Sequence, residues 1–283
     1  GTVWFGLTGG EPLLNEDIVE IVETAGHDST VKLFTTGYSL TKQLAADLKK
    51  AGLSSVSISL DHWTEAAHDR VRGCAGAFRT ALDAIGILKE TGIHTGVSTV
   101  VSKDMIRDGR LETFIQFLID LGVHEAWLSE AKPTVAAFRK EELVITEEER
   151  RSLVALQDRY NRDGEITVNY LGHFEGKEHF GCNAGNNMVY IDAFGEVSPC
   201  VFVPITFGNV GDDSITNIFS RMKKHFPTED SCFINKNCGL LDKYDKGKSP
   251  IDKENTLKLM EEVRFGPLAR FPQIYYKKNR PDG

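Results

Sequence analysis

Short apolar runs alternate with longer amphipathic stretches along the first half of the chain. Runs of apolar and β-branched residues are typical of short buried strands, and they occupy 3–7, 31–34, 56–60, 95–101 and 126–128. Between these runs, apolar residues recur at helical spacing and each stretch is followed by a glycine, over 15–25, 41–51, 78–90 and 110–121. This alternation predicts a parallel sheet with right-handed crossovers. Periodicity alone leaves open whether the sheet is a partial barrel or a doubly wound open sheet.

The pattern changes after about Lys132. Residues 146–162 predict an amphipathic helix that begins with a capping box formed by Thr146 and Glu149. A further strand is expected over 166–170. From Gly181 onward, two short apolar runs flank a turn at 192–195 and predict a β-hairpin.

Helices are expected within 213–224 and in the tail. We therefore expect three parts in the chain. They are a sheet domain over 1–165, a small second domain over 166–245, and a C-terminal helix and tail over 246–283.

Composition places the chain among ordinary globular proteins. Its 283 residues are 41% hydrophobic and 26% charged, and the formal net charge is −8. The acidic balance argues against a nucleic-acid partner, which favours a basic surface. The sequence has no apolar run long enough to cross a membrane and no signal peptide. It starts inside a strand-like run without Met, so we expect a piece of a longer, cytoplasmic protein.

Polar groups follow several of the predicted strands. Ligands bind at the carboxyl ends of the strands in parallel α/β sheets, so chemistry is expected there. The glycines of Gly9-Gly10-Glu11-Pro12 permit close approach of a ligand, and Glu11 could accept hydrogen bonds from an ammonium group. Asp61 could bind a ribose diol, and nearby hydroxyl groups could bind a carboxylate. Taken singly, each group also fits helix capping or a solvated strand end.

These segments, in this order, resemble the radical S-adenosylmethionine (radical SAM) superfamily. The resemblance rests on Thr8-Gly9-Gly10-Glu11-Pro12, Thr35-Thr36-Gly37, Ser57-Ile58-Ser59-Leu60-Asp61 and His68-Asp69-Arg70-Val71-Arg72-Gly73. It implies that the sheet is a partial (β/α)6 TIM-like barrel, and that S-adenosylmethionine binds at the carboxyl ends of its strands. Gly9, Gly10 and Glu11 are then expected to hold the methionine amine. The other implied cofactor contacts are Thr36, Ser59, Asp61 and Ser98, with Thr99 and Arg72 nearby.

The sequence departs from the family at one point. The Cys-x3-Cys-x2-Cys motif that binds the catalytic cluster is absent, and the chain begins at what resembles the second strand. We therefore expect the first strand and the cluster loop to be missing, and the catalytic cluster to be present only in the full-length parent. Cys74 cannot replace three thiolates, and we interpret it as a buried small residue. No catalytic side chain is identified.

Four further cysteines lie in the last part of the chain, Cys182, Cys200, Cys232 and Cys238. Four thiolates suit a [4Fe–4S] cluster or a tetrahedral zinc ion, and free cysteines are a third interpretation. The spacing of Cys182 and Cys200, with Gly195 between them, resembles the auxiliary-cluster domains called SPASM and twitch. That resemblance implies one auxiliary [4Fe–4S] cluster bound by the four cysteines.

The resemblance implies an enzyme that cleaves S-adenosylmethionine reductively and abstracts hydrogen from a substrate. The substrate is expected to be a peptide or a small molecule held between the barrel mouth and the auxiliary cluster. A reducing donor such as flavodoxin or ferredoxin is also expected. Our first hypothesis is peptide or protein modification, or maturation of a peptide-derived cofactor. The alternatives are a radical dehydrogenase of a small hydroxylated substrate and a non-catalytic metal-binding scaffold.

Overall fold

The computed structural model describes residues 2–134, 143–227, 229–245, 247, 249–272 and 274. The chain divides into two compact units: the first comprises 1–130 and 145–170, and the second comprises 131–144 and 171–283. The sequence placed the first boundary after residue 165, whereas the strand at 167–170 packs with the first unit. The sequence separated a tail at residue 246, and the described residues of that tail belong to the second unit.

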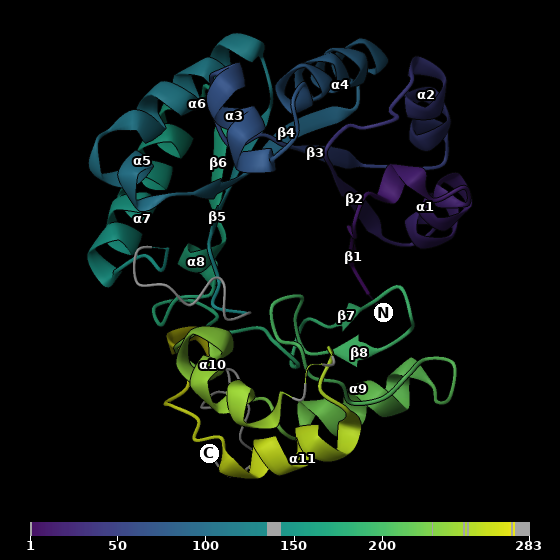
Figure 1. The fold of residues 1–283 in the computed structure, drawn as a ribbon, viewed down its shortest axis with the longest axis vertical. Coiled ribbons are helices and arrows are strands. Elements are labelled where there is room, and N and C mark those ends of the chain that lie inside the picture. The colour runs from purple at the N-terminus through teal and green to yellow at the C-terminus, as the bar shows by residue number, and fades with distance from the viewer. Residues whose placement is uncertain are drawn as a thin grey trace. The chain divides into compact units, whose positions relative to one another are not determined.

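The first unit is a parallel sheet curled into a half-barrel, as the sequence predicted. Its strands lie side by side in chain order: β1 (Trp4–Leu7), β2 (Thr30–Thr35), β3 (Ser55–Ser59), β4 (His94–Val101), β5 (Glu125–Glu130) and β6 (Thr167–Tyr170). Figure 1 shows the helices along the outer side of this sheet. They are α1 (Ile18–Gly26), α2 (Lys42–Lys50), α3 (Glu65–Arg72), α4 (Ala77–Thr91), α5 (Lys103–Arg107), α6 (Arg110–Leu121) and α7 (Glu147–Asp163).

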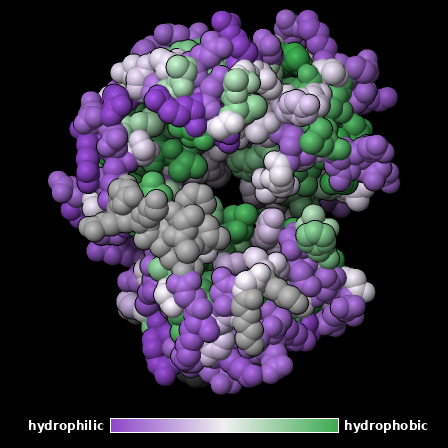
Figure 2. Space-filling model, viewed as in Figure 1, coloured by the Kyte–Doolittle hydropathy of each residue, from purple (hydrophilic) through white to green (hydrophobic). Residues whose placement is uncertain are grey.

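The period of the strands explains why one face carries the helices. Alternate residues point to opposite faces of a strand, and one set is apolar and fully buried, for example Leu33, Ile58, Val97 and Leu128. This set packs with the apolar sides of the helices into one core. The solvent sides of the helices are mainly hydrophilic in the view of Figure 2.

Local signals place most helix ends where the sequence expected them. The Thr41 hydroxyl accepts a hydrogen bond from the Leu44 backbone N–H (3.1 Å) at the start of α2. The predicted Thr146–Glu149 capping box is confirmed at the start of α7. Two helices were not predicted, α3 and α5. Each is short, and each buries a single side chain, so neither has an apolar stripe to detect.

The inner face of the sheet carries polar and aromatic side chains. Lys32 on β2 forms an ion pair with Glu125 on β5, and both are buried, at 4% and 8% exposure. Asn169 on β6 donates a hydrogen bond to the other carboxylate oxygen of Glu125 (3.1 Å). The rings of Phe34 and Trp127 also meet, with centroids 6.0 Å apart. Because β3 and β4 lie between β2 and β5, these contacts require the sheet to curl.

Gly96 makes room for the ion pair. It lies on β4 beside Glu125, and a Cβ at this position would fall 2.5 Å from Glu125 Cγ. The missing side chain lets Glu125 lie over β4 and reach Lys32. Burial lowers the pKa of Lys32 to about 8, so the lysine is still mainly protonated at neutral pH.

The second unit combines a small hairpin with helices. The predicted hairpin is confirmed as β7 (Tyr190–Ile191) and β8 (Val197–Ser198), which pair antiparallel. Asp192 shapes the turn, since its Oδ1 accepts from the backbone N–H groups of Phe194 (2.8 Å) and Glu196 (2.9 Å). Gly195 has φ +85°, which favours glycine. The helices are α8 (Leu171–Phe174), α9 (Ile215–Lys223), α10 (Phe233–Tyr244) and α11 (Lys253–Glu262), of which α8 and α10 were not predicted.

Among the described residues, no helix is both long and apolar enough to cross a membrane.

Replacing Lys32 with Met tests the ion pair inside the half-barrel. The variant leaves the Glu125 carboxylate buried without its cation, so we expect the free energy of unfolding to fall by about 3–5 kcal/mol. The double variant Lys32→Met/Glu125→Leu should recover most of that loss because it removes both charges. Urea denaturation of the three proteins measures this. Equal stability of Lys32→Met and the wild type would contradict the proposed importance of the pair.

Candidate functional site

The loop after β1 presents a carboxylate that is held by many donors. Glu11 Oε1 accepts from the Leu13 backbone N–H (3.1 Å) and the Thr35 hydroxyl (2.5 Å). Glu11 Oε2 accepts from the Thr36 backbone N–H (2.8 Å) and the Thr36 hydroxyl (2.5 Å). Four donors from two neighbouring segments therefore fix the orientation of an ionised carboxylate at the ends of β1 and β2.

The backbone in front of Glu11 borders open space. Gly9 has φ +152°, and a Cβ built at Gly9 or Gly10 would meet no heavy atom within 4 Å. Both glycines are exposed. A ligand can therefore approach the main chain here without meeting a side chain.

Two serines on adjacent strands form the next part of this rim. Ser59 on β3 and Ser98 on β4 are register partners, so their side chains lie side by side on the inner face. Both are half-buried. Trp127 is in turn the partner of Ser98, and Asn169 is the partner of Trp127. The inner face thus offers a row of hydroxyl, indole and amide groups across β3 to β6.

Asp61 makes more contacts with protein than its predicted role suggested. Its Oδ1 accepts from the Thr99 hydroxyl (3.3 Å) and from the Val100 backbone N–H (3.1 Å), both on β4. Its Oδ2 forms an ion pair with Arg72 Nε (2.8 Å). Asp61 is 8% exposed, so it ties the end of β3 to the end of β4 and to α3.

His68 forms a hydrogen bond with the backbone of Asp61. Its Nδ1 accepts a hydrogen bond from the Asp61 backbone N–H (3.1 Å), and the ring is buried at 1% exposure. Burial lowers the pKa of His68, although the charge of Asp61 acts in the opposite direction. The neutral imidazole therefore carries its proton on Nε2.

The structure brings the sequence-predicted residues to one edge of the sheet. Thr36 contacts Glu11 and directly follows the last residue of β2, and Ser59 is the last residue of β3. Ser59 pairs with Ser98, and Asp61 contacts the end of β4. Since all six strands are parallel, this edge is the carboxyl edge.

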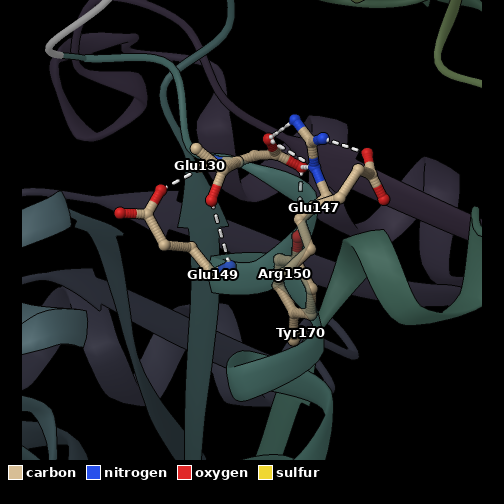
Figure 3. Close-up of polar contacts among 6 residues, drawn as sticks. Glu130, Glu147, Glu149, Arg150 and Tyr170 are labelled. Carbon is tan, nitrogen blue, oxygen red and sulfur yellow. Dashed lines mark hydrogen bonds and ion pairs between the residues drawn. The ribbon is translucent and has the colours of Figure 1, made fainter.

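Sequence reasoning missed a buried polar network at the end of β5. Arg150 on α7 contacts Glu130 Oε2 (2.8 Å) and Glu147 Oε1 (2.5 Å), and the Tyr170 hydroxyl donates to Glu130 Oε1 (3.2 Å). Figure 3 shows these side chains converging beside the capping box that contains Glu149. The network joins Glu130, where the chain leaves the first unit, to α7, which begins just after the chain returns to that unit.

The charges of this network shift the protonation of its members. Burial alone would lower the pKa of Arg150, but its hydrogen bonds to Glu130 and Glu147 and their charges raise it overall. Burial and the neighbouring charge of Glu130 raise the pKa of Tyr170. Arg150 therefore stays charged and Tyr170 stays a hydrogen-bond donor. Apart from the capping box and the Glu147–Arg150 pair, the network depends on contacts of Glu130 with residues 20 and 40 positions away, which no local sequence signal marks.

In the second unit, Cys232 interacts with both Cys182 and Cys200. None of the four C-terminal cysteines forms a disulfide, and Cys182 and Cys200 are buried. A hydrogen bond with Cys232, followed by burial, raises the pKa of Cys182. Burial, with smaller effects of Glu175 and Cys232, raises the pKa of Cys200 to about 12.

Cys238 lies on α10, six residues after Cys232, and six residues of helix span about 9 Å. No group of three or more His, Cys, Asp or Glu side chains with metal-binding geometry is found in the described part of the chain. Cysteine thiolates are nevertheless the ligands that iron–sulfur clusters and structural zinc use. The assignment of all four cysteines as ligands stays a prediction.

The expectation for Cys74 was wrong, because this residue is exposed rather than buried. It follows Gly73, which has φ +65° and ends α3, and it lies in the loop before α4. A short loop between two surface helices leaves no core for the side chain to enter.

Comparisons with known proteins match both units. Residues 2–118 match the family model described as the radical SAM superfamily. Residues 182–239 match SPASM, which is described as an iron–sulfur cluster-binding domain. The first region contains Glu11, Thr36, Ser59, Asp61 and Ser98, and the second contains the four C-terminal cysteines.

Individual relatives match this chain at low sequence identity. The AdoMet-dependent heme synthase of Methanosarcina barkeri is 25% identical over 260 residues, which cover 83% of this chain and 73% of that protein. The PqqA peptide cyclase of Gluconobacter oxydans is 23% identical over 233 residues, which cover 78% of this chain and 63% of that protein. SuiB of Streptococcus suis, solved with its precursor peptide SuiA, matches with a TM-score of 0.66 at 15% identity. That match covers 88% of this chain and 63% of SuiB, and it shows the fold alone.

Replacing Glu11 with Gln tests the loop after β1. The amide nitrogen would face donors from Leu13 and Thr35 or from Thr36, so we expect unfolding to become easier by about 1–3 kcal/mol. Glu16→Gln is the matched control, because Glu16 is exposed in the same loop region. Chemical denaturation measures both variants. If Glu11→Gln is as stable as Glu16→Gln, the four hydrogen bonds do not organise the loop.

Alkylation rates test the environments of the cysteines in the metal-free, reduced chain. We expect iodoacetamide to modify exposed Cys74 at least a hundredfold faster than Cys200, because a pKa of about 12 leaves little thiolate at neutral pH. Cys182 should also react slowly. Mass spectrometry of digests taken over time gives the rate at each site. Rapid labelling of Cys200 would show that the thiol is neither buried nor strongly protonated.

Proposed function

Because the chain carries a domain of the radical SAM superfamily followed by an iron–sulfur SPASM domain, we propose that it serves a radical SAM enzyme. Domains of these two kinds bind S-adenosylmethionine and [4Fe–4S] clusters. When bound, the cofactor supplies a 5′-deoxyadenosyl radical that removes hydrogen from a substrate. The sequence contains no Cys-x3-Cys-x2-Cys, so this cleavage requires a catalytic cluster that these residues do not supply.

The carboxyl edge of the half-barrel fits S-adenosylmethionine. Glu11 is a fixed anion beside exposed glycine backbone, which suits the ammonium group of a methionine moiety. All its accepting positions are occupied by protein donors, so a bound ammonium displaces a donor, and we propose the rotatable Thr36 hydroxyl. Ser59 and Ser98 supply paired hydroxyl groups for the ribose. The observation that carries this proposal is that Glu11, Thr36, Ser59 and Ser98 share one edge of the sheet.

We propose that Asp61 positions neighbouring protein groups, whereas the two serines contact the cofactor. Both of its carboxylate oxygens already accept hydrogen bonds or pair with Arg72. A ribose hydroxyl could reach Asp61 only by sharing an oxygen with these donors. Asp61 therefore acts chiefly by holding Arg72 and the end of β4 in place.

For the substrate, we propose a peptide or protein, with modification of a side chain or maturation of a peptide-derived cofactor as the outcome. Two matches support this class: the PqqA peptide cyclase and SuiB, which was solved with a precursor peptide. A small substrate is the second candidate, because the heme synthase match covers a larger share of both chains. That candidate includes a heme precursor as well as the small hydroxylated substrate expected from the sequence. The reductant is proposed to be a flavodoxin or a ferredoxin.

Binding of S-adenosylmethionine tests the first part of the proposal. Ser59→Ala should weaken binding about tenfold, the equivalent of about 1.4 kcal/mol for one lost hydrogen bond. Ser55→Ala is the matched control, since Ser55 lies on the same strand and face at the amino end. Anaerobic calorimetry gives both affinities. Equal weakening by the two variants, or no binding by the wild type, would overturn the assignment of the carboxyl edge.

Metal analysis tests the second part. After anaerobic reconstitution, we expect about four iron and four sulfide per chain, unchanged in Cys74→Ser and lost in Cys200→Ser. Zinc without sulfide would replace the cluster by a zinc site. A scaffold without catalysis would be indicated if a full-length parent formed no 5′-deoxyadenosine with dithionite and S-adenosylmethionine.

A further inference from the structure

A buried carboxylate lies next to the cysteines of the second unit. Glu229 is 1% exposed and precedes Cys232 by three residues. Its Oε2 accepts from the Gly266 backbone N–H (2.6 Å) and from Lys236 Nζ (2.9 Å). Its Oε1 is buried and has no hydrogen-bond partner in the described part of the chain. A buried carboxylate oxygen without a partner is costly and therefore calls for a functional explanation.

The backbone of Glu229 contacts the segment that carries another cysteine. The Glu229 carbonyl accepts from the Cys182 backbone N–H (2.9 Å). The packing is close, because a Cβ at Gly181 would fall 2.3 Å from that carbonyl oxygen. On another side, Glu229 forms a β-bridge with Leu268. Glu229 thus joins the segment of Cys182, the start of α10 at Cys232, and the segment around Gly266.

The backbone places Glu229 near two of the cysteines. Cys182 and Cys232 share a hydrogen bond, and Glu229 contacts the backbone of Cys182 and precedes Cys232 by three residues. The counter-ion Lys236 is 35% exposed, whereas Glu229 is buried. Water therefore screens the positive charge more than the negative one, and the ion pair leaves a net negative field around Glu229.

We propose that Glu229 is a positioning residue for the auxiliary cluster and that its charge lowers the reduction potential of that cluster. The inference rests on the proposed function, since it assumes that these cysteines bind an iron–sulfur cluster. The carboxylate holds three segments in register around two of the ligands. A negative charge near a cluster disfavours the addition of an electron, because net charge is one of the factors that set cluster potentials.

The test uses the whole chain reconstituted anaerobically with iron and sulfide. The sequence lacks the catalytic cysteine motif, so the signal comes from the auxiliary site alone. A redox titration followed by electron paramagnetic resonance should give a more positive potential for Glu229→Gln than for the wild type. Glu254→Gln is the control: Glu254 also pairs with a lysine, but it is exposed on α11, and its loss should leave the potential unchanged.

The outcomes separate charge from simple loss of structure. Glu229→Gln with full iron content and an unchanged potential would overturn the proposal. If Glu229→Gln fails to hold iron, Lys236→Gln carries the test, because it removes the opposite charge of the same ion pair. A more negative potential for Lys236→Gln supports the proposal, and an equal or more positive one refutes it. A wild-type chain that binds no iron would instead disprove the proposed function on which the inference rests.

Discussion

The ion pair between Lys32 and Glu125 is the constraint on which the first unit depends. It spans the inner face from β2 to β5, two strands that never touch through the sheet's own hydrogen bonds. Taking both charges out of water is costly, and only close contact with further hydrogen bonding repays it. Asn169 provides that bonding, and Gly96 leaves the space for Glu125 to reach across. In a flatter sheet Lys32 and Glu125 would lie too far apart to pair, and two buried charges would lack a partner. The ion pair therefore favours the curled form.

Curvature matters because the candidate site belongs to several strands at once. Glu11, Thr36, Ser59 and Ser98 contribute to one site only if the carboxyl ends of β1 to β4 follow a common arc. Contacts between neighbouring strand ends then fix the details, through Glu11 with Thr36 and Asp61 with β4. Outside the sheet, Arg150 and Glu130 fix the end of β5 against α7. Polar networks inside and outside the sheet therefore hold the rim, while the apolar core between sheet and helices provides most of the stability.

Periodicity and turn chemistry predicted most of the fold. Period-two and helical patterns predicted the strands and the longer helices, and the strand-end residues followed from the rule that parallel strands share a carboxyl edge. The failures have a common cause. Lys32 and Glu125 are 93 residues apart, and Asp61 and Val100 are 39 apart, so no local pattern links them. Asp61 looked available for a ligand because the sequence does not show its protein donors. The exposure of Cys74 likewise depends on where a two-helix loop lies, which composition does not reveal.

The cysteines of the second unit show why residue type alone does not define a metal site. Thiolates, not thiols, bind metal, so binding releases protons, and the raised pKa values of Cys182 and Cys200 make that release costly. Metal affinity must offset this cost, and nearby charges change it. Lys132 lowers the pKa of Cys200 and Glu175 raises it. The number and type of ligands determine which metals a site can bind, whereas the charges around those ligands set how readily the site forms.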